Sequence, residues 1–151
     1  MIGASRADAA TIETAREVGE RLAAAGAILL TGGRGGVMEA ASRGAAQGGG
    51  MTVGILPGCD RAQANQWVRV AIPTGLGELR NGLLVRAADA LIAVGGGYGT
   101  LSEIALGLQA NKVVIGLGSW SIDGVRAADS PAQAVGWALA AAAPRGEDGT
   151  G

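Results

Sequence analysis

The sequence lacks histidine and contains only one cysteine and one lysine among its 151 residues. Without histidine the chain can form no Ser-His-Asp triad, no Cys-His pair and no HExxH zinc site. Cys59 has no second cysteine for an internal disulfide or a cysteine-rich zinc cluster. Lys112 follows Asn111 rather than a glycine, which excludes a Walker A loop and leaves one candidate lysine for a pyridoxal Schiff base.

An excess of charge of one sign is also missing. The formal net charge is −1 and the sequence contains no basic cluster, whereas nucleic-acid binding depends on neutralising phosphates. No apolar run reaches the roughly 20 residues that span a bilayer, and the N-terminus shows no basic region followed by an apolar core. We therefore expect no nucleic-acid partner, no membrane partner and a cytoplasmic location.

The length and composition predict one folded domain. Hydrophobic residues make up 48% and charged residues 17% of the chain, which favours folding over disorder. A domain of this size buries roughly 70% of the surface that its unfolded chain exposes, so it needs no disulfide or metal for stability. We expect the domain to cover residues 1–143, residues 144–151 to form a flexible tail, and no metal site.

Short apolar segments alternate with segments of helical periodicity along the chain. Apolar runs predict buried strands at Ala27–Thr31, Thr52–Leu56, Val68–Ile72, Ala90–Val94 and Val113–Leu117. Spacing and boundary residues predict helices at Thr11–Ala25, Val37–Gln47, Glu78–Ala88, Leu101–Ala110 and Pro131–Ala143. This alternation predicts a Rossmann-like α/β fold, a doubly wound parallel sheet within three α/β/α layers. Met1-Ile2 leaves only a stub before the first turn, so we expect a shortened first strand or a true start further upstream.

Glycine accounts for 28 residues and clusters in two segments, Gly32–Gly36 and Gly95–Gly99. Each segment follows a predicted strand and precedes a predicted helix, where free N–H groups and the helix dipole favour an anion. Two such loops at the carboxyl ends of strands indicate a phosphorylated ligand. The alternative is that the glycines only allow tight connections and close packing. Neither loop fits G-x-G-x-x-G, so we expect no standard NAD site.

Polar side chains beside the second loop allow two interpretations. Thr100 and Glu103 have the spacing of a capping box, in which each side chain caps the backbone N–H of the other. Alternatively, Thr100 contacts a phosphate and Glu103 faces the ligand from the first helical turn, where a carboxylate is favoured. Arg80 and Arg86 stand six residues apart on one predicted helix, so at most one should point at the glycine loops. Arg34 in the first loop is a further anion ligand candidate; each arginine could instead be a solvated surface charge.

Together these residues resemble the LOG (LONELY GUY) family, historically labelled "lysine decarboxylase-like". The family's signature is an Arg-Lys pair on a helix followed by Pro-Gly-Gly-x-Gly-Thr-x-x-Glu. The matching segments here are Arg80, Arg86, Asp89–Ile92, Gly95–Glu103 and, for the first glycine loop, Thr31–Ala45. The resemblance runs from about Ile2 to Trp120. It implies a Rossmann-like fold, a homodimer or homotetramer, and, in the hydrolytic members, cleavage of nucleoside 5′-monophosphates to free base and ribose 5-phosphate.

The resemblance also implies roles for individual residues. The family's catalytic arginine and glutamate correspond to Arg80 and Glu103. The residues expected to contact a ligand or cofactor are Gly3, Ser5, Gly32, Gly33, Arg34, Gly35, Gly36, Gly96, Gly97, Tyr98, Gly99 and Thr100. The decarboxylase label gains no support, because no pyridoxal phosphate site is recognisable.

Two departures from the signature shift the expected function. Asn81 replaces the family lysine, and Gly95 replaces the proline that opens the motif. The string RNGLLVRAADALIAVGGGYGTLSEIALGL is more similar to a sister branch that includes molybdenum cofactor carrier proteins. The resemblance therefore implies a binding protein for a phosphorylated small molecule, a nucleotide or molybdenum cofactor. The alternatives are a phosphoribohydrolase and a DNA-processing protein of the DprA type, which the acidic balance disfavours. Leu83, Leu84, Leu106 and Leu108 are expected to be exposed and to hint at an oligomer.

Overall fold

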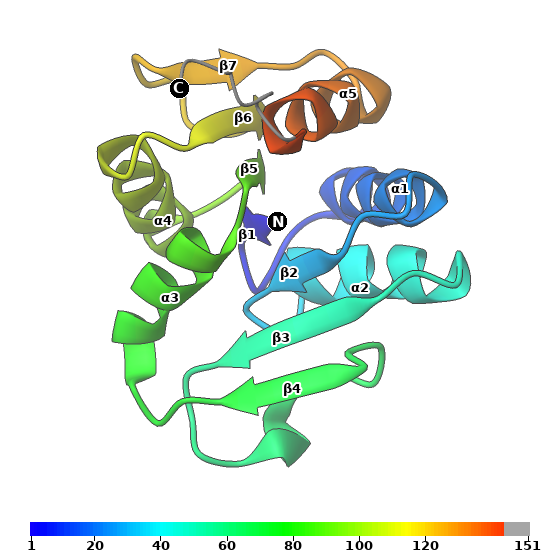
Figure 1. Cartoon of the computed structure of the whole chain (residues 1–151), viewed down its shortest axis with the longest axis vertical. Coiled ribbons are helices and arrows are strands. Elements are labelled where there is room, and N and C mark those ends of the chain that lie inside the picture. The colour runs from blue at the N-terminus through cyan, green and yellow to red at the C-terminus, as the bar shows by residue number, and fades with distance from the viewer. Residues whose placement is uncertain (144–151) are drawn as a thin grey trace, which may run out of the picture.

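The computed structural model describes residues 1–143, in which strands and helices alternate (Figure 1). The strands are β1 (Ile2–Gly3), β2 (Leu29–Thr31), β3 (Thr52–Leu56), β4 (Val70–Pro73), β5 (Ala90–Val94), β6 (Val113–Leu117) and β7 (Val125–Ala127). The helices are α1 (Ala9–Ala24), α2 (Val37–Gln47), α3 (Arg80–Ala87), α4 (Tyr98–Gln109) and α5 (Pro131–Ala142), with 3-10 turns η1 (Arg61–Gln63) and η2 (Gly77–Leu79). The predicted tail, residues 144–151, lies outside the described residues.

Every strand pairing in the described chain is parallel. One sheet has the order β1-β5-β6-β7 and the other the order β2-β3-β4. The two sheets meet where β1 lies beside β2, and there the Met1 amino group donates a hydrogen bond to the Leu30 carbonyl at 2.9 Å (Figure 1). Strand β1 contains only two residues, as short as predicted. The Rossmann-like parallel α/β fold is therefore confirmed.

Helices cover both faces of the strands. Helices α1, α2 and α5 lie on one face, and α3 and α4 lie on the other (Figure 1). Each face has its own apolar cluster, because parallel strands sandwiched between helices bury aliphatic side chains on both sides. The fully buried members include Val18, Val37 and Ile115 on the α1 face and Leu84, Leu91 and Ile104 on the α3 face.

The structure corrects several expected element boundaries. Helix α4 begins at Tyr98, three residues before the expected start at Leu101. The helix expected from Glu78 begins instead as the 3-10 turn η2, and α3 starts only at Arg80. Strand β7 was not predicted, because its three residues are mostly exposed and form no apolar run. These corrections move the second glycine loop into the start of a helix.

The leucines expected to be exposed divide into two groups. Leu83 and Leu106 are exposed, as predicted. Leu84 is fully buried, and Leu108 packs against the α3-face cluster, so for these two the prediction was wrong. Positions 83 and 84 are adjacent, and adjacent residues of a helix point in directions about 100° apart. Composition alone could not distinguish the inward leucine from the outward one.

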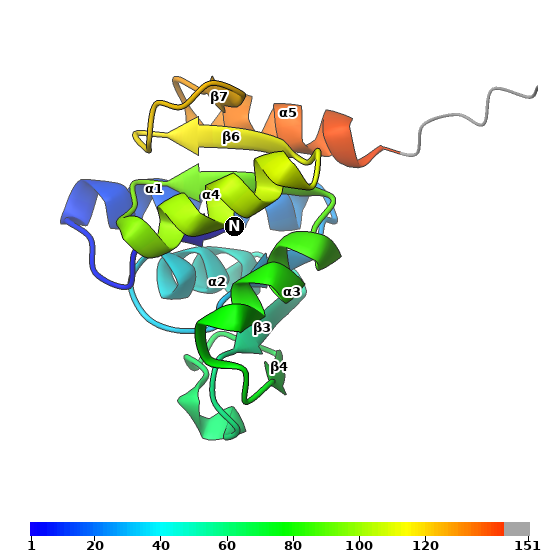
Figure 2. The ribbon, with the colours of Figure 1, turned by 90° about the vertical axis from the view of Figure 1, so that its left-hand side faces the viewer.

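The parallel arrangement gathers the glycine loops at one edge of the molecule. The arrowheads of β5 and β6 point to the same edge, and α1 and α4 begin there (Figure 2). This edge holds the carboxyl ends of the strands, where open α/β sheets bind ligands. No helix among residues 1–143 is long and apolar enough to cross a membrane.

Candidate functional site

The first glycine loop, Gly32–Gly36, is shaped mainly by packing. Gly33 and Gly36 have φ angles of 75° and 64°, which side chains rarely adopt. A Cβ at Gly36 would overlap the Ala4 carbonyl oxygen, and a Cβ at Gly32 would overlap Nη1 of Arg80. Gly33 and Gly36 therefore require glycine for internal reasons, and a side chain at Gly32 would displace Arg80. For this loop the packing interpretation of its glycines has direct structural support.

The β1 turn is fitted against the same loop. A Cβ at Gly3 would overlap the Val37 side chain, so Gly3 allows β1 to approach α2. The Val37 N–H donates to the Ala4 carbonyl at 3.0 Å. Ser5 is exposed beside the loop, with its carbonyl oxygen near the space above Gly35. Gly3 thus has a packing role, while Ser5 and Gly35 remain accessible from outside.

The second glycine loop differs because two of its glycines, Gly97 and Gly99, face open space. Gly95 and Gly96 have φ angles of 56° and 127°, so the turn itself needs glycine. A Cβ at Gly97 or at Gly99, by contrast, would meet no atom within 4 Å. Neither of these two positions has a positive φ angle, so packing and conformation do not explain their glycines. An exposed backbone without side chains suits close approach by a ligand.

The start of α4 supplies the donors of this site. The N-cap is Gly97, which has no side chain to cap the helix, so the first N–H groups stay free for an anion. Of the two interpretations, the capping box is wrong, because Thr100 is the third residue of the helix rather than its cap. The Thr100 Oγ1 atom is buried without a hydrogen-bond partner and lies beneath Gly96. The hydroxyl therefore supports the loop from below, and Gly97, Tyr98 and Gly99 form its outer surface.

Arg80 is buried against the first glycine loop, within range of the charge of Glu103. It is 7% exposed, and its Nη1 donates to the Ile55 carbonyl at 2.8 Å. Its Nε atom is buried without a partner. Burial lowers the pKa of Arg80, and the charge of Arg34 lowers it further, whereas Glu103 opposes the shift. The main cause is therefore the loss of solvation of the guanidinium, and an anion close to it would favour the charged form.

Glu103 is the acidic group of the site. It lies in the second turn of α4 rather than the expected first, and it is 8% exposed. Burial raises its pKa to about 7, although the charge of Arg80 acts in the opposite direction. The described residues give its carboxylate no hydrogen bond and no ion pair. Such a carboxyl group can accept or release a proton near neutral pH.

Two residues that were not expected at the site lie beside it. Asn81, at the position of the family lysine, is buried and its Oδ1 has no partner. Trp120, in the loop after β6, donates from its indole Nε1 to the Gly97 carbonyl at 3.2 Å. Asn81 was visible in the sequence as a departure from the family signature. No local pattern pointed to Trp120, because its contact with Gly97 spans 23 residues.

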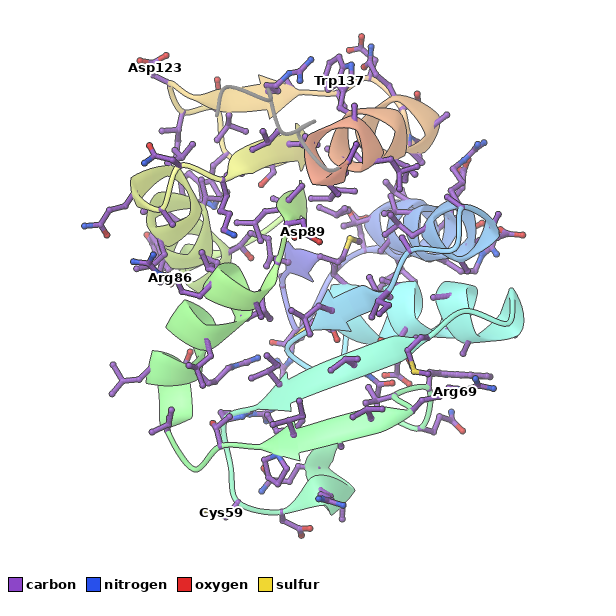
Figure 3. The ribbon with its side chains drawn as sticks, in the orientation of Figure 1. Cys59, Arg69, Arg86, Asp89, Asp123 and Trp137 are labelled. Carbon is purple, nitrogen blue, oxygen red and sulfur yellow. The ribbon has the colours of Figure 1, made fainter. Side chains whose placement is uncertain are left out.

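The two arginines of α3 point in different directions, as their spacing predicted. Arg80 is buried at the site, whereas Arg86 is exposed on the outer side of α3 (Figure 3). Asp89 lies at the beginning of β5, away from the glycine loops, which follow the ends of their strands (Figure 3). Arg86 and Asp89 therefore take no part in the candidate site.

Two cavities lie at opposite ends of the strands. A cavity of about 270 Å³ lies at the carboxyl ends of β5 and β6, between the starts of α1 and α5, with Thr11, Gly118 and Asp129 in its lining. A larger cavity of about 730 Å³ lies at the opposite ends of the strands. Among the described residues its lining is almost entirely aliphatic, and Asp89 supplies its one charged side chain, so it does not suit a phosphate.

The fold and this edge define a class of protein with a Rossmann-like core and an open, glycine-rich helix start at the carboxyl ends of its strands. The chain belongs to the SLOG cluster4 family, whose model matches residues 1–142. This match confirms the predicted LOG-like relationship.

Three relatives illustrate the family relationship. An uncharacterized protein of Archaeoglobus fulgidus is 43% identical over 140 residues, which cover 92% of each chain. The molybdenum cofactor binding protein of Rippkaea orientalis is 38% identical with a TM-score of 0.85, covering 89% of this chain and 90% of that one. The molybdenum cofactor carrier protein of Chlamydomonas reinhardtii is 36% identical with a TM-score of 0.81, covering 91% of both chains.

Proposed function

We propose that the protein binds a phosphorylated small molecule at the start of α4 and carries it without needing to convert it. The observation that carries this proposal is the open backbone at Gly97 and Gly99, which neither packing nor conformation explains. Free N–H groups at the helix start would hold the phosphate, and the buried Arg80 would add a charge beneath it. Arg34, an exposed cation in the first glycine loop, would add a second positive charge.

Molybdenum cofactor and nucleotides are the two ligand classes that we propose. Support for molybdenum cofactor comes from the two similar proteins described as binding or carrying it. The residues present fit its phosphate, since the site combines an uncapped helix start with the unpartnered donor Arg80 Nε. Asn81 also lacks the charge of the family lysine, which favours holding a ligand over hydrolysing it. We also propose a cytoplasmic location. It is supported by the single cysteine, because a chain with so few cysteines suits a reducing compartment.

A ligand panel tests the binding function. Purified protein would be melted with molybdenum cofactor under anaerobic conditions, and with AMP, GMP or ribose 5-phosphate. A ligand present at a hundredfold excess over its Kd should stabilise the fold by about 2.7 kcal/mol, which corresponds to roughly 5–10 °C in Tm. A Tm that responds to no phosphorylated ligand in the panel would contradict the proposal.

Hydrolysis of a nucleoside 5′-monophosphate is the second candidate function. The observation that favours it is Glu103, a buried carboxyl with a pKa of about 7 whose charge interacts with Arg80. In this mechanism the helix start anchors the 5′-phosphate. Glu103 stabilises the developing ribosyl cation and directs a water to it, while Arg80 holds the phosphate or assists the departing base.

Base release distinguishes the two candidates. The protein would be incubated with AMP and an N6-substituted AMP, and free base would be separated by chromatography. Glu103→Ala, run beside it, controls for contaminating hydrolases. Release that disappears in the variant would establish hydrolysis, whereas thermal protection without release supports a binder.

Self-association is also part of the proposal. The outer side of η2, α3 and α4 exposes Leu76, Leu79, Leu83 and Leu106, and Leu79 is 79% exposed. Apolar side chains gathered on adjacent elements favour a protein interface over a solvated surface. We propose that this leucine surface joins copies of the chain in a homodimer or homotetramer, as the family resemblance implies.

A further inference from the structure

Two of the chain's four aromatic residues meet at the second glycine loop. The sequence has three tryptophans, one tyrosine and no phenylalanine. Tyr98 opens α4 and Trp120 follows β6, yet their ring centroids lie 6.2 Å apart with an interplanar angle of 30°. Such rarity makes the placement of this pair informative, because the core is built from aliphatic residues instead.

Neither ring of the pair serves the core. Tyr98 is 84% exposed and Trp120 is 36% exposed. An exposed aromatic ring forgoes the burial that makes such residues stabilising in cores and interfaces. Tyr98 is therefore available to pack against something outside the described chain.

Trp120 holds the pair in a fixed relation to the loop. Its indole Nε1–H donates to the Gly97 carbonyl at 3.2 Å, and Gly97 directly precedes Tyr98. One side of the Tyr98 ring is thus backed by Trp120, which is itself tied to the proposed phosphate site. A ring preorganised in this way loses little conformational freedom when a ligand arrives.

From this geometry we propose that the exposed face of Tyr98 stacks on a planar heteroaromatic ring of the ligand, with Trp120 as the positioning residue behind it. The inference rests on the proposed function, since the phosphate of the same ligand occupies the helix start one residue away. It narrows the ligand class to phosphate esters that carry a flat heteroaromatic ring, such as the purine of a nucleotide or the pyrimidine portion of a pterin. Sugar phosphates that carry no heteroaromatic ring are excluded as the principal ligand. Aromatic stacking tolerates different ring identities, because each presents a π-face.

The test separates the ring from the phosphate. GMP and molybdenum cofactor carry a fused heterocycle with the same 2-amino-4-oxopyrimidine portion and are called the ringed probes. Ribose 5-phosphate carries only its sugar and is called the ringless probe. Affinities would be measured by isothermal titration for the wild type, Tyr98→Leu and Tyr98→Phe. Trp137→Phe serves as the matched control, because Trp137 lies on α5, packed with Arg126, away from the α4 start (Figure 3).

The expected result has three parts. At least one ringed probe binds the wild type more tightly than ribose 5-phosphate does. Tyr98→Leu lowers the affinity for that probe about tenfold and leaves the affinity for ribose 5-phosphate unchanged. Tyr98→Phe and Trp137→Phe bind as the wild type does, and ligand addition quenches tryptophan fluorescence in the wild type but not in Trp120→Leu.

Three outcomes would overturn the inference. Ringed probes that bind no more tightly than ribose 5-phosphate would show that the ring contributes nothing. Equal losses for ringed and ringless probes in Tyr98→Leu would show that Tyr98 only shapes the loop. Unchanged binding of every probe in that variant would remove Tyr98 from the site. Binding of no probe to the wild type would instead refute the proposed function, and the stacking inference with it.

Discussion

The guanidinium of Arg80 lies where a side chain at Gly32 would have to be. A Cβ at position 32 would overlap Nη1 of Arg80, the atom that donates to the Ile55 carbonyl. The glycine of the first loop and the arginine before the second are therefore fitted to one another. Through this contact the packing of the first loop influences the position of Arg80 in the candidate site.

Replacing Gly32 with alanine should displace Arg80. The added methyl group overpacks a buried contact, so we expect a loss of about 1–3 kcal/mol in the free energy of unfolding, together with weaker ligand binding. Gly82→Ala is the matched control, because a Cβ at Gly82 meets no atom within 4 Å. Urea unfolding of both variants would measure the difference. Equal stability of the two variants would show that Arg80 adapts freely.

Replacing Gly99 with alanine should separate stability from binding. Gly99 lies in the first turn of α4 with open space around it, so alanine should raise helix stability by up to about 1 kcal/mol. The same methyl group would obstruct an anion at the helix start. Thermal melts with and without ligand would show a Tm that is equal or higher in the free variant and a smaller ligand-induced shift. A Tm of the free variant below that of the wild type would contradict the expectation that position 99 has room for a methyl group.

The stability of the fold should depend on the ionisation of Glu103. Burial raises its pKa from 4.5 to about 7, so the protonated carboxyl stabilises the folded state fully below about pH 4.5. That contribution is lost as the pH rises through 7, with a total on the order of 3 kcal/mol. Glu103→Gln cannot ionise and should lack this loss. The measurement is the free energy of unfolding of both proteins at about pH 5 and about pH 8. If this free energy changed equally with pH in both proteins, ionisation of Glu103 would not be the cause.

Charge on the leucine surface should break the oligomer. Leu79→Asp combined with Leu83→Asp places two carboxylates on exposed positions of η2 and α3, so the fold should persist while association fails. Ile28→Asp, at an exposed apolar position away from these elements, serves as the control. Sedimentation velocity should show the wild type and the control as oligomers and the double variant as a monomer. A monomeric wild type would remove the proposal.

The parallel fold and the position of the glycine loops could be predicted from the sequence, because alternating apolar and helical segments and clustered glycines are local signals. The predicted separation of Arg80 from Arg86 also followed from helical spacing. The exact start of α4 could not be predicted: Gly97 acts as an N-cap through its backbone alone, so the Thr-x-x-Glu pattern suggested a start that tertiary structure overrides. Trp120 was missed because its contact with Gly97 is made across a loop and depends on the sheet order.

The different roles of the two glycine loops were likewise invisible before the fold was known. Gly36 and Gly97 are the same residue type in similar sequence contexts, each the N-cap of a helix. The backbone angles and the neighbouring atoms distinguish Gly36, which has a positive φ and lies against the Ala4 carbonyl, from Gly97, which faces open space. The sequence shows where each glycine stands, but the role of that glycine depends on atoms of residues that are distant in sequence.

The most direct test of the central claim is a comparison of ligand-induced stabilisation in the wild type and in Gly97→Val. Valine fits the extended backbone at this position and meets no atom within 4 Å at its Cβ, so the free variant should melt like the wild type. Its side chain would nevertheless fill the space that the phosphate needs. We predict that molybdenum cofactor or GMP raises the Tm of the wild type by roughly 5–10 °C and leaves that of the variant unchanged. An equal shift in both proteins would show that the ligand binds elsewhere and would contradict the account.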